Sequence, residues 1–428
     1  MGRSPGGAVI CVLSFEGPDQ YSQAGGLGSR VSGLVRALAG RGFETHLFFV
    51  GDPGLPALEE SDGVRYHRWS QWLSGHHPRG VYDGEAAKVE DWNRSLPPWL
   101  EANLIAPAVQ DQRPVIVLAE DWQTAMVVRL LSDRLLRSRL RPRTVILWNA
   151  NNLYGFERIE VQALDRAATL TTVSRYMKHR MWQWSVNPMV IPNGIPESAR
   201  LPVSGRDARL IRRAAGADLC CFKIGRFDPD KRWLMAVTAM ARLKRQGRSV
   251  KLLIRGSRDG HGRQVLAHAR AQGLSVAEAR SPQTVTELIG VLKAHSEVDL
   301  INLSSFLPEA ILAPIYRSVD AVLANSGHEP FGLVGLEVMA AGGVAVTGST
   351  GEDYAQPYRN AIVLETEDPR ELSGSLGRLL EQPQWGQSLR RRGRETALDY
   401  TWERVLEQLF DRIDLISERS WYANGAGA

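Results

Sequence analysis

The sequence predicts an α/β protein built from two doubly wound parallel-sheet domains. The length of 428 residues is enough for two domains. Short apolar runs alternate with amphipathic helical stretches along most of the chain. Both halves begin with the same order of strand, loop, helix and strand. Strict alternation needs crossover connections, which produce parallel sheets covered on both faces.

The N-terminal half opens with a strand at 8–15, a Gly-rich loop at 23–28, a helix at 29–39 and a strand at 43–50. This is a βαβ unit whose Gly-rich turn follows the first strand. Open α/β sheets bind ligands at this edge, beyond the carboxyl ends of their strands. Further strands are expected at 115–119, 144–148, 168–173 and 189–191.

The region 51–112 breaks the alternation and is expected to be an irregular insertion with a helix near 99–109. It contains four tryptophans, among them Trp92 and Trp99. One interpretation is that they pack the insertion onto the domain. The other is that Trp92 and Trp99 stack on the sugar rings of an acceptor.

The C-terminal half begins after a turn at 192–196 and a linker at 201–206. It repeats the opening pattern, with a strand at 219–224, a loop at 225–230, a helix at 232–245 and a strand at 249–254. Further strands are expected at 298–303, 321–325, 344–347 and 361–364. Further helices are expected at 284–294, 309–317, 331–341 and 369–380. The domains are therefore expected to span 1–200 and 201–400.

The composition indicates an ordinary globular protein and excludes several classes. Basic and acidic residues nearly balance, 52 against 47, which does not describe a nucleic-acid binder. The three cysteines form no disulfide or metal framework, so a cytoplasmic location is expected. The apolar run at 8–15 is too short to span a membrane, and we expect no transmembrane segment.

The segment 328–337, with the sequence HEPFGLVGLE, is the most informative part of the chain. A helix is expected from Phe331, with Glu329 at its mouth and Glu337 about two turns in. A helix start suits a phosphate, because it offers free N–H groups and a positive dipole end. Carboxylates suit the hydroxyl groups of sugars and riboses. Together they suggest a sugar nucleotide.

Two cations, Arg226 and Lys231, flank the loop that follows the strand at 219–224. At this edge of a parallel sheet they could bracket a diphosphate. The alternative is a solvated loop with ordinary surface charges. The pair Asp228 and Asp230 has metal-like spacing, but the neighbouring cations argue against a metal, and none is expected.

Other polar residues also follow predicted strands. Glu120 and Asn151 come after the strands at 115–119 and 144–148, and Gly25 and Gly26 lie in the loop after the first strand. These glycines suit a close approach to a phosphate or sugar, or simply a tight turn. Asp121 could cap the next helix, and asparagines also form turns.

These motifs resemble the two-domain GT-B glycosyltransferases, especially the retaining family 4 and its glycogen and starch synthase relatives. The resemblance runs nearly end to end. The motifs that carry it are QAGGLG at 23–28, EDWQTA at 120–125, VSRYM at 173–177, IPNGI at 191–195, Arg226 with Lys231, Glu329 with Glu337, and YTWER at 400–404.

The resemblance implies roles for these residues, in two domains that face an interdomain cleft. Arg226 and Lys231 would stabilise the leaving nucleoside diphosphate, and Glu337 would bind the ribose. Glu329 and the backbone of 331–333, which is Phe331, Gly332 and Leu333, would hold the donor sugar. Gly25 and Gly26 would approach the sugar phosphate, and the helix at 401–428 would cross back to the first domain. The family requires no obligatory metal or cofactor.

Two departures stand out. Position 120 is Glu where the family usually has a histidine that faces the reacting sugar, and position 23 is Gln where glycogen synthases have Lys. The leading hypothesis is a retaining transferase that moves a hexose, expected to be glucose, from an ADP-, UDP- or GDP-hexose to a glucan or small carbohydrate-like acceptor. Glu120, Arg226, Lys231 and Glu329 are its predicted catalytic residues. The alternatives are a catalytically weak sugar-nucleotide or glycan-binding homologue and an NDP-sugar 2-epimerase.

Overall fold

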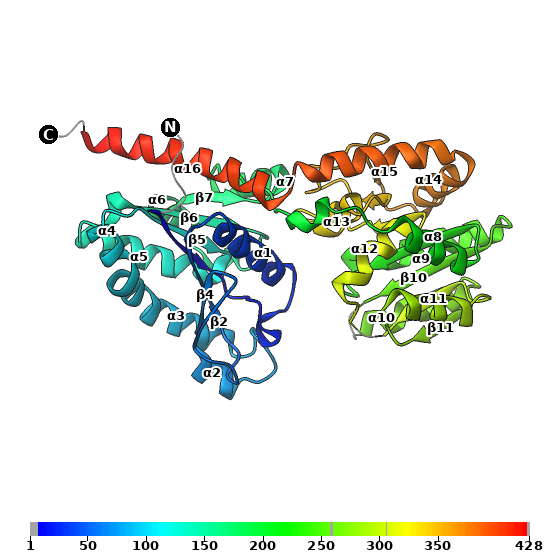
Figure 1. Ribbon diagram of the computed structural model, residues 1–428, viewed down its shortest axis with the longest axis horizontal. Helices are drawn as coiled ribbons and strands as arrows, with labels where there is room; N and C mark the ends of the chain where they lie inside the picture. Colours follow the sequence, from blue (N-terminus) through cyan, green and yellow to red (C-terminus); the bar gives the residue numbers. More distant parts are fainter. Residues whose placement is uncertain (1–6, 257–259, 305, 426–428) are drawn as a thin grey trace. The chain divides into compact units, whose positions relative to one another are not determined.

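The computed structural model describes residues 7–256, 260–304 and 306–425. The chain divides into two compact units. Unit 1 comprises Met1–Pro196 with Trp402–Ala428, and unit 2 comprises Glu197–Thr401. Each unit contains one sheet of mostly parallel strands, as the alternation of strands and helices predicts, and Figure 1 labels its elements.

The sheet of unit 1 has eight strands within the described residues, in the order β3-β4-β2-β1-β5-β6-β7-β8. The strands are β1 (Val9–Leu13), β2 (Glu44–Val50), β3 (Leu58–Ser61), β4 (Val64–Trp69), β5 (Val115–Glu120), β6 (Thr144–Ala150), β7 (Thr169–Thr172) and β8 (Met189–Val190). All neighbouring pairs are parallel except β3 and β4. Val9 pairs with both Glu44 and Val115, so β1, β2 and β5 end at one edge of the sheet.

Helices cover both faces of this sheet. On one face, α1 (Gly26–Gly40) and α16 (Trp402–Gly425) join the sheet in one hydrophobic core. That core takes Leu47 and Phe49 from β2, whereas Phe48 between them points to the other face and contacts Trp99. The other helices of unit 1 are α2 (Gln71–His76), α3 (Glu85–Leu100), α4 (Ala106–Gln110), α5 (Ala125–Arg137), α6 (Val161–Ala167) and α7 (Arg175–Met181).

The region 51–112 is regular, where the sequence suggested irregular structure. It supplies β3, β4 and the helices α2, α3 and α4, with a π-helix at Glu101–Ile105 between α3 and α4. Pro97 and Pro98 lie inside α3 and hid this helix from the sequence pattern. Proline removes a backbone donor, and a wider π turn is a common way for a helix to absorb such a disruption.

A buried histidine pair between β2 and β4 predicts an acid-sensitive stability. His46 Nδ1 lies 2.9 Å from His67 Nε2, so one ring donates and the other accepts. Burial and the neighbouring charges of His46 and Arg65 lower the pKa of His67 to about 4. A depressed histidine pKa contributes stability above the unfolded value of about 6.5, which is lost as the pH falls towards 4.

We therefore expect the free energy of unfolding to fall by about 3 kcal/mol between pH 7 and pH 4 on account of His67. Urea titrations of the wild type and of His67→Leu across this range measure the difference. The stability gap between the two proteins should change by that amount. A gap that stays constant with pH would contradict the assignment.

The sheet of unit 2 has seven strands within the described residues, all parallel, in the order β11-β12-β10-β9-β13-β14-β15. The strands are β9 (Leu219–Ile224), β10 (Val250–Arg255), β11 (Val276–Ala279), β12 (Leu300–Leu303), β13 (Ala321–Ala324), β14 (Ala345–Thr347) and β15 (Ile362–Val363). The helices are α8 (Gly205–Ala215), α9 (Trp233–Arg245), α10 (Gly260–Ala271), α11 (Val285–Ala294), α12 (Glu309–Ser318), α13 (Leu333–Ala340), α14 (Pro369–Glu381) and α15 (Pro383–Leu398).

Several elements of unit 2 differ from the sequence prediction, which placed no helix at α10 or at α15. The segment expected to be a linker begins α8, whose N-terminus is capped by Ser204 accepting a hydrogen bond from the Asp207 N–H. Only three of its residues, Ala208, Ile211 and Ala215, are buried, so the apolar pattern is weak. The edge strand β11 was also missed, because it is short and only partly buried.

Candidate active site

In unit 2 the predicted donor residues come from two neighbouring strands. Ala321 and Val322 of β13 pair with Cys221 and Phe222 of β9, so the loops after both strands leave the same edge of the sheet. The loop after β9 carries Arg226 and Lys231, and the loop after β13 carries Glu329. Sequence positions about a hundred residues apart are thus brought to one place.

The structure joins Lys231 and Glu329 directly. Lys231 Nζ donates to Glu329 Oε2 at 2.5 Å, and the two side chains are 24% and 21% exposed. Lys231 ends a 3₁₀ turn, Pro229–Lys231, whose start is fixed by Asp228 accepting from the Asp230 N–H at 2.9 Å. The Arg226 side chain is exposed, while its carbonyl accepts from Trp233 Nε1 at 2.8 Å.

Asp230 fastens the two loops to each other. Its carboxylate accepts from the His328 N–H at 3.1 Å and lies 3.0 Å from His328 Nδ1, and its carbonyl accepts from the Gly327 N–H at 2.7 Å. Both aspartates of the 228–230 segment therefore have partners within the protein. In the described part of the chain no group of three His, Cys, Asp or Glu side chains is placed to hold a metal ion.

Beneath this edge lies a buried lysine that the sequence analysis did not single out. Lys223 of β9 is 2% exposed, and its Nζ donates to Asn325 Oδ1 at 2.6 Å and to the Leu323 carbonyl at 2.9 Å. Burial and the charge of nearby Lys231 hold the pKa of Lys223 well below its ordinary value. Lys223 links β9 to the end of β13 and so supports both loops.

The turn before α13 is built around a left-handed glycine. Gly332 has φ 80°, and a Cβ there would lie 2.7 Å from Glu352 Cγ and 3.0 Å from Tyr354 Oη. Tyr354 donates to the Gly332 carbonyl. Phe331 is 2% exposed and packs against Tyr354, so its side chain belongs to the core and only its backbone is left for a ligand.

The helix α13 begins at Leu333, two residues later than predicted. Glu337 is therefore at the start of its second turn rather than two turns in. Its carboxylate accepts a hydrogen bond from Tyr316 Oη at 3.4 Å. Glu329 lies before the helix, in the loop, as expected.

A second buried carboxyl group, Glu352, supports the Glu329 turn and gave no sequence signal. It accepts from the Thr350 N–H at 3.1 Å, and Thr350 Oγ1 accepts from the Glu329 N–H at 2.8 Å. Burial raises the pKa of Glu352 to about 7, and the charge of Glu329 adds to the rise. The Glu329 turn therefore rests on a carboxyl group that is partly protonated near neutral pH.

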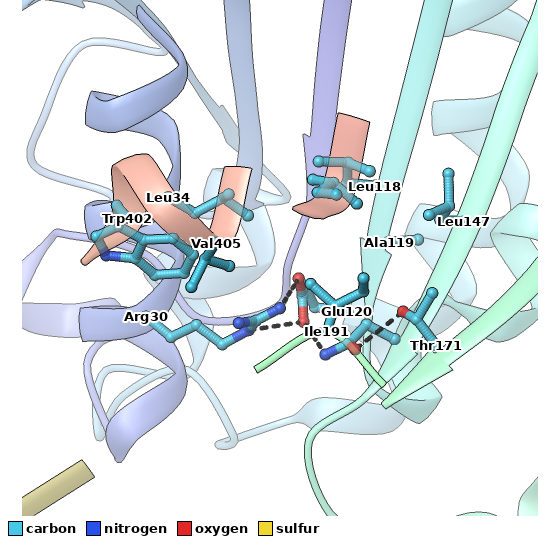
Figure 2. Close-up of a pocket in the computed structure, with 12 residues that line it drawn as sticks. Arg30, Leu34, Leu118, Ala119, Glu120, Leu147, Thr171, Ile191, Trp402 and Val405 are labelled. Carbon is cyan, nitrogen blue, oxygen red and sulfur yellow. Dashed lines mark hydrogen bonds and ion pairs between the residues drawn. The ribbon is translucent and has the colours of Figure 1, made fainter. Parts of the chain in front are cut away.

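In unit 1 the structure places Glu120 in the interior. It is 1% exposed, and its carboxylate receives Arg30 Nη2 at 3.1 Å and Arg30 Nε at 3.2 Å. The amides of Asn149 and Asn151 donate to Glu120 Oε2 at 2.9 and 2.7 Å. Figure 2 shows Arg30 reaching this carboxylate beside Trp402. Both oxygens of this carboxylate therefore have partners within unit 1.

A small cavity of about 30 Å³ lies beside this ion pair, with Leu34 and Trp402 among its lining residues. Asp121 does not cap the following turn with its side chain, contrary to one sequence interpretation. Its carboxylate accepts instead from the Asn151 N–H at 2.8 Å. Burial raises the pKa of Asp121 to about 7. The backbone of Asp121 has a positive φ of 60°.

The two tryptophans proposed as acceptor contacts pack inside unit 1. Trp92 is fully buried and lies 5.8 Å from Phe15, ring centre to ring centre. Trp99 packs against Phe48 and His67, each at 5.4 Å. The structure therefore supports the packing interpretation for Trp92, whose ring is fully buried, while Trp99 is only partly buried beside its aromatic neighbours.

Sequence comparison divides the chain in the same way as the structure. The family described as "Glycosyl transferases group 1" matches residues 212–397, in unit 2. The family described as "Glycosyl transferase 4-like domain" matches residues 25–194, in unit 1.

Individual relatives match at moderate identity. An uncharacterized glycosyltransferase of Methanocaldococcus jannaschii is 25% identical over 393 residues, which cover 88% of this chain and 90% of that protein. A D-inositol 3-phosphate glycosyltransferase of Frankia alni is 30% identical over 170 residues, 39% of this chain and 38% of that protein.

Solved structures share the fold over nearly the whole length. Sucrose-phosphate synthase from Thermosynechococcus elongatus has a TM-score of 0.67 at 20% identity, covering 96% of this chain and 100% of that chain. The catalytic domain of starch synthase IV from Arabidopsis thaliana, bound to ADP and acarbose, has a TM-score of 0.67 at 15% identity, covering 97% and 99%.

Among residues 7–256, 260–304 and 306–425, no helix combines the length and apolar character needed to cross a bilayer.

The fold and both sequence matches agree with the motif resemblance. The chain thus belongs to the GT-B glycosyltransferases of group 1, a GT4-like family of enzymes that use nucleotide-sugar donors.

Proposed function

We propose that unit 2 binds the nucleotide-sugar donor at the edge formed by the loops after β9 and β13. The observation that carries this proposal is the Lys231–Glu329 pair, 2.5 Å apart, in which Lys231 comes from the loop that also carries Arg226. Arg226 and Lys231 hold the diphosphate, and Glu337 binds the ribose hydroxyls. Glu329 and the backbone of 331–333 hold the donor sugar.

The chemistry of transfer favours this arrangement. Breaking a glycosyl–phosphate bond develops negative charge on the diphosphate and positive charge at the anomeric carbon. In this proposal fixed cations stabilise the leaving diphosphate, and the carboxylate of Glu329 faces the sugar. The reaction proposed is the retaining transfer of a hexose, with glucose as the expected sugar and ADP, UDP or GDP as the leaving group.

The acceptor proposed is a glucan or a small carbohydrate-like molecule, which binds at unit 1. The names of the similar proteins, sucrose-phosphate synthase and starch synthase, support this class. Glu120 keeps a place in this proposal as a positioning residue. It orients Asn151 and Arg30 instead of touching the sugar, since its carboxylate is buried and bonded.

A nucleotide-sugar panel tests the proposal. ADP-, UDP- and GDP-hexoses are first screened by thermal shift, because a ligand that binds only the folded state raises the melting temperature. Those that bind are then incubated with glucose, a maltooligosaccharide and inositol phosphate, and release of the nucleoside diphosphate is measured. Release that depends on acceptor supports the proposal. Binding without release, or isomerisation of the donor sugar, would overturn it.

Two glycines of one helix test whether a ligand approaches the Gly-rich loop. A Cβ added at Gly26 or at Gly40, the two ends of α1, meets no atom within 4 Å. Both Gly→Ala variants should therefore fold. Their free energy of unfolding should rise by at most about 1 kcal/mol, because the unfolded chain has less entropy. We expect Gly26→Ala to raise the donor KM at least tenfold and Gly40→Ala to leave it unchanged. Equal kinetics for the two variants would show that no substrate approaches Gly26.

A further inference from the structure

A buried glutamate holds the Gly-rich loop of unit 1. Glu16 lies shortly after β1 and is 4% exposed. Its Oε2 accepts from the backbone N–H groups of Gly25 at 3.0 Å, Gly28 at 3.1 Å and Ala24 at 3.3 Å. Its carboxylate thus takes some of the N–H groups at the start of α1, those of Gly25 and Gly28, which would otherwise suit a bound anion. The shape of this loop depends on Glu16.

The other oxygen of Glu16 is held by a residue from the 51–112 region. Tyr82 Oη donates to Glu16 Oε1 at 2.7 Å. Burial and the charge of Glu16 raise the pKa of Tyr82 far above its ordinary value, so the phenol stays protonated and remains a donor. The Tyr82 ring, 41% exposed, stacks on Phe15 with ring centres 6.0 Å apart.

Lys88 fixes the turn that carries Tyr82. This lysine of α3 is fully buried, and its Nζ donates to the carbonyls of Asp83 at 2.7 Å and Val81 at 3.1 Å. It also donates to Tyr21 Oη at 2.7 Å, on the segment before the Gly-rich loop. An ammonium group bound to carbonyls on both sides of Tyr82 leaves this turn little freedom.

These contacts form one continuous path, from Lys88 through the 81–83 turn and Tyr82 to Glu16 and the N–H groups of Gly25 and Gly28. An open groove of about 710 Å³ lies along the path, with Tyr21, Gln23, Arg79 and Tyr82 among its lining residues. A ligand in this groove would touch Tyr82 and the Gly-rich loop together.

We propose that Glu16 and Tyr82 are positioning residues for glycosyl transfer. Tyr82, which belongs to the 51–112 region, holds Glu16, and Glu16 holds the Gly-rich loop. Glu16 acts through the loop, because its carboxylate is buried and bonded on both oxygens. The glycine N–H groups at Gly25 and Gly28 are then structural donors to Glu16 and not a phosphate site. This inference concerns the transfer step and does not depend on which residues of unit 2 hold the donor.

The test compares Tyr82→Phe, Glu16→Gln and the double variant, with Tyr358→Phe as the control. Tyr358 is 71% exposed and lies in unit 2. We expect kcat to fall about tenfold in Tyr82→Phe and about a hundredfold in Glu16→Gln. Since Tyr82 acts through Glu16, the double variant should be no slower than Glu16→Gln. The Kd of the nucleoside diphosphate and the kinetics of Tyr358→Phe should not change.

Hydrogen exchange supplies a readout independent of turnover. The amides of Gly25 and Gly28 should exchange faster in Glu16→Gln, because their acceptor is weakened. Faster exchange with kcat within twofold of the wild type would overturn the proposal, and so would full additivity of the two substitutions. If Glu16→Gln does not fold, Tyr82→Phe decides alone, assayed well below its melting temperature. A normal Kd for the diphosphate in Lys231→Ala would instead contradict the donor site and leave this inference standing.

Discussion

Replacing Lys231 with alanine should lower kcat/KM by a factor of about 10² to 10³ and leave the fold intact. Lys231 supplies a cation next to Glu329, and we propose that the leaving diphosphate gains its charge there. Removing one such stabilising donor typically costs about 3–4 kcal/mol in the transition state. Glu329→Ala should have a similar effect, because the carboxylate is proposed to face the donor sugar. Steady-state kinetics with the preferred nucleotide sugar measure both losses.

An ion pair between a lysine and an aspartate elsewhere in unit 2 provides the matched control. Lys244 Nζ donates to Asp299 at 2.7 Å, with the lysine side chain 42% exposed. Lys244→Ala removes a similar ion pair outside the proposed site and should keep full turnover. If Lys231→Ala also keeps full turnover, or if it loses activity only because its melting temperature drops below the assay temperature, the site assignment is wrong.

Removing the Glu120 carboxylate should cause the largest loss of stability among single substitutions at the proposed sites. Glu120→Ala leaves Arg30 buried without its carboxylate, and the side chains of the pair are 6% and 2% exposed. Breaking a buried pair from one side typically costs about 3–5 kcal/mol. The same variant removes the acceptor of the Asn149 and Asn151 amides. Denaturant unfolding of Glu120→Ala and the wild type measures the difference.

The partner variant and a surface pair give this experiment its controls. In the double variant Glu120→Ala/Arg30→Ala, the loss in the free energy of unfolding should be smaller than the sum of the losses in the two single variants. The buried charge without a partner is then absent. The exposed pair Arg391–Glu395, at 3.9 Å, should lose less than about 1 kcal/mol in Glu395→Ala. A loss below about 1 kcal/mol in Glu120→Ala would mean that Glu120 is not held as the structure shows, and would reopen a direct catalytic role.

The meeting of Lys231 and Glu329 at the proposed donor edge of unit 2 could be predicted, because it depends only on local sequence patterns. Each motif follows a strand, and parallel strands that are neighbours bring their carboxyl ends to one edge. Lys231 and Glu329 therefore lie together although they are far apart in sequence. Even here the start of α13 was predicted too early, because Pro330 and Gly332 place the turn between the strand and the helix.

The side-chain contacts within unit 1 could not be predicted in the same way. Glu120 looked like a residue open to substrate, because its sequence position says nothing of Arg30, which reaches it from α1. The bond between Tyr82 and Glu16 likewise depends on where the 51–112 region folds. Trp92 shows the same limit, since aromatic residues serve packing and sugar binding equally and only tertiary burial separates the two.

The central claim is that unit 2 holds the donor diphosphate with Lys231, and calorimetric titration tests it most directly. ADP, UDP and GDP are titrated into the wild type, Lys231→Ala and Lys244→Ala. We expect one nucleoside diphosphate to bind the wild type and Lys244→Ala with equal Kd, and to bind Lys231→Ala at least tenfold more weakly. Equal affinity for all three proteins would contradict the account.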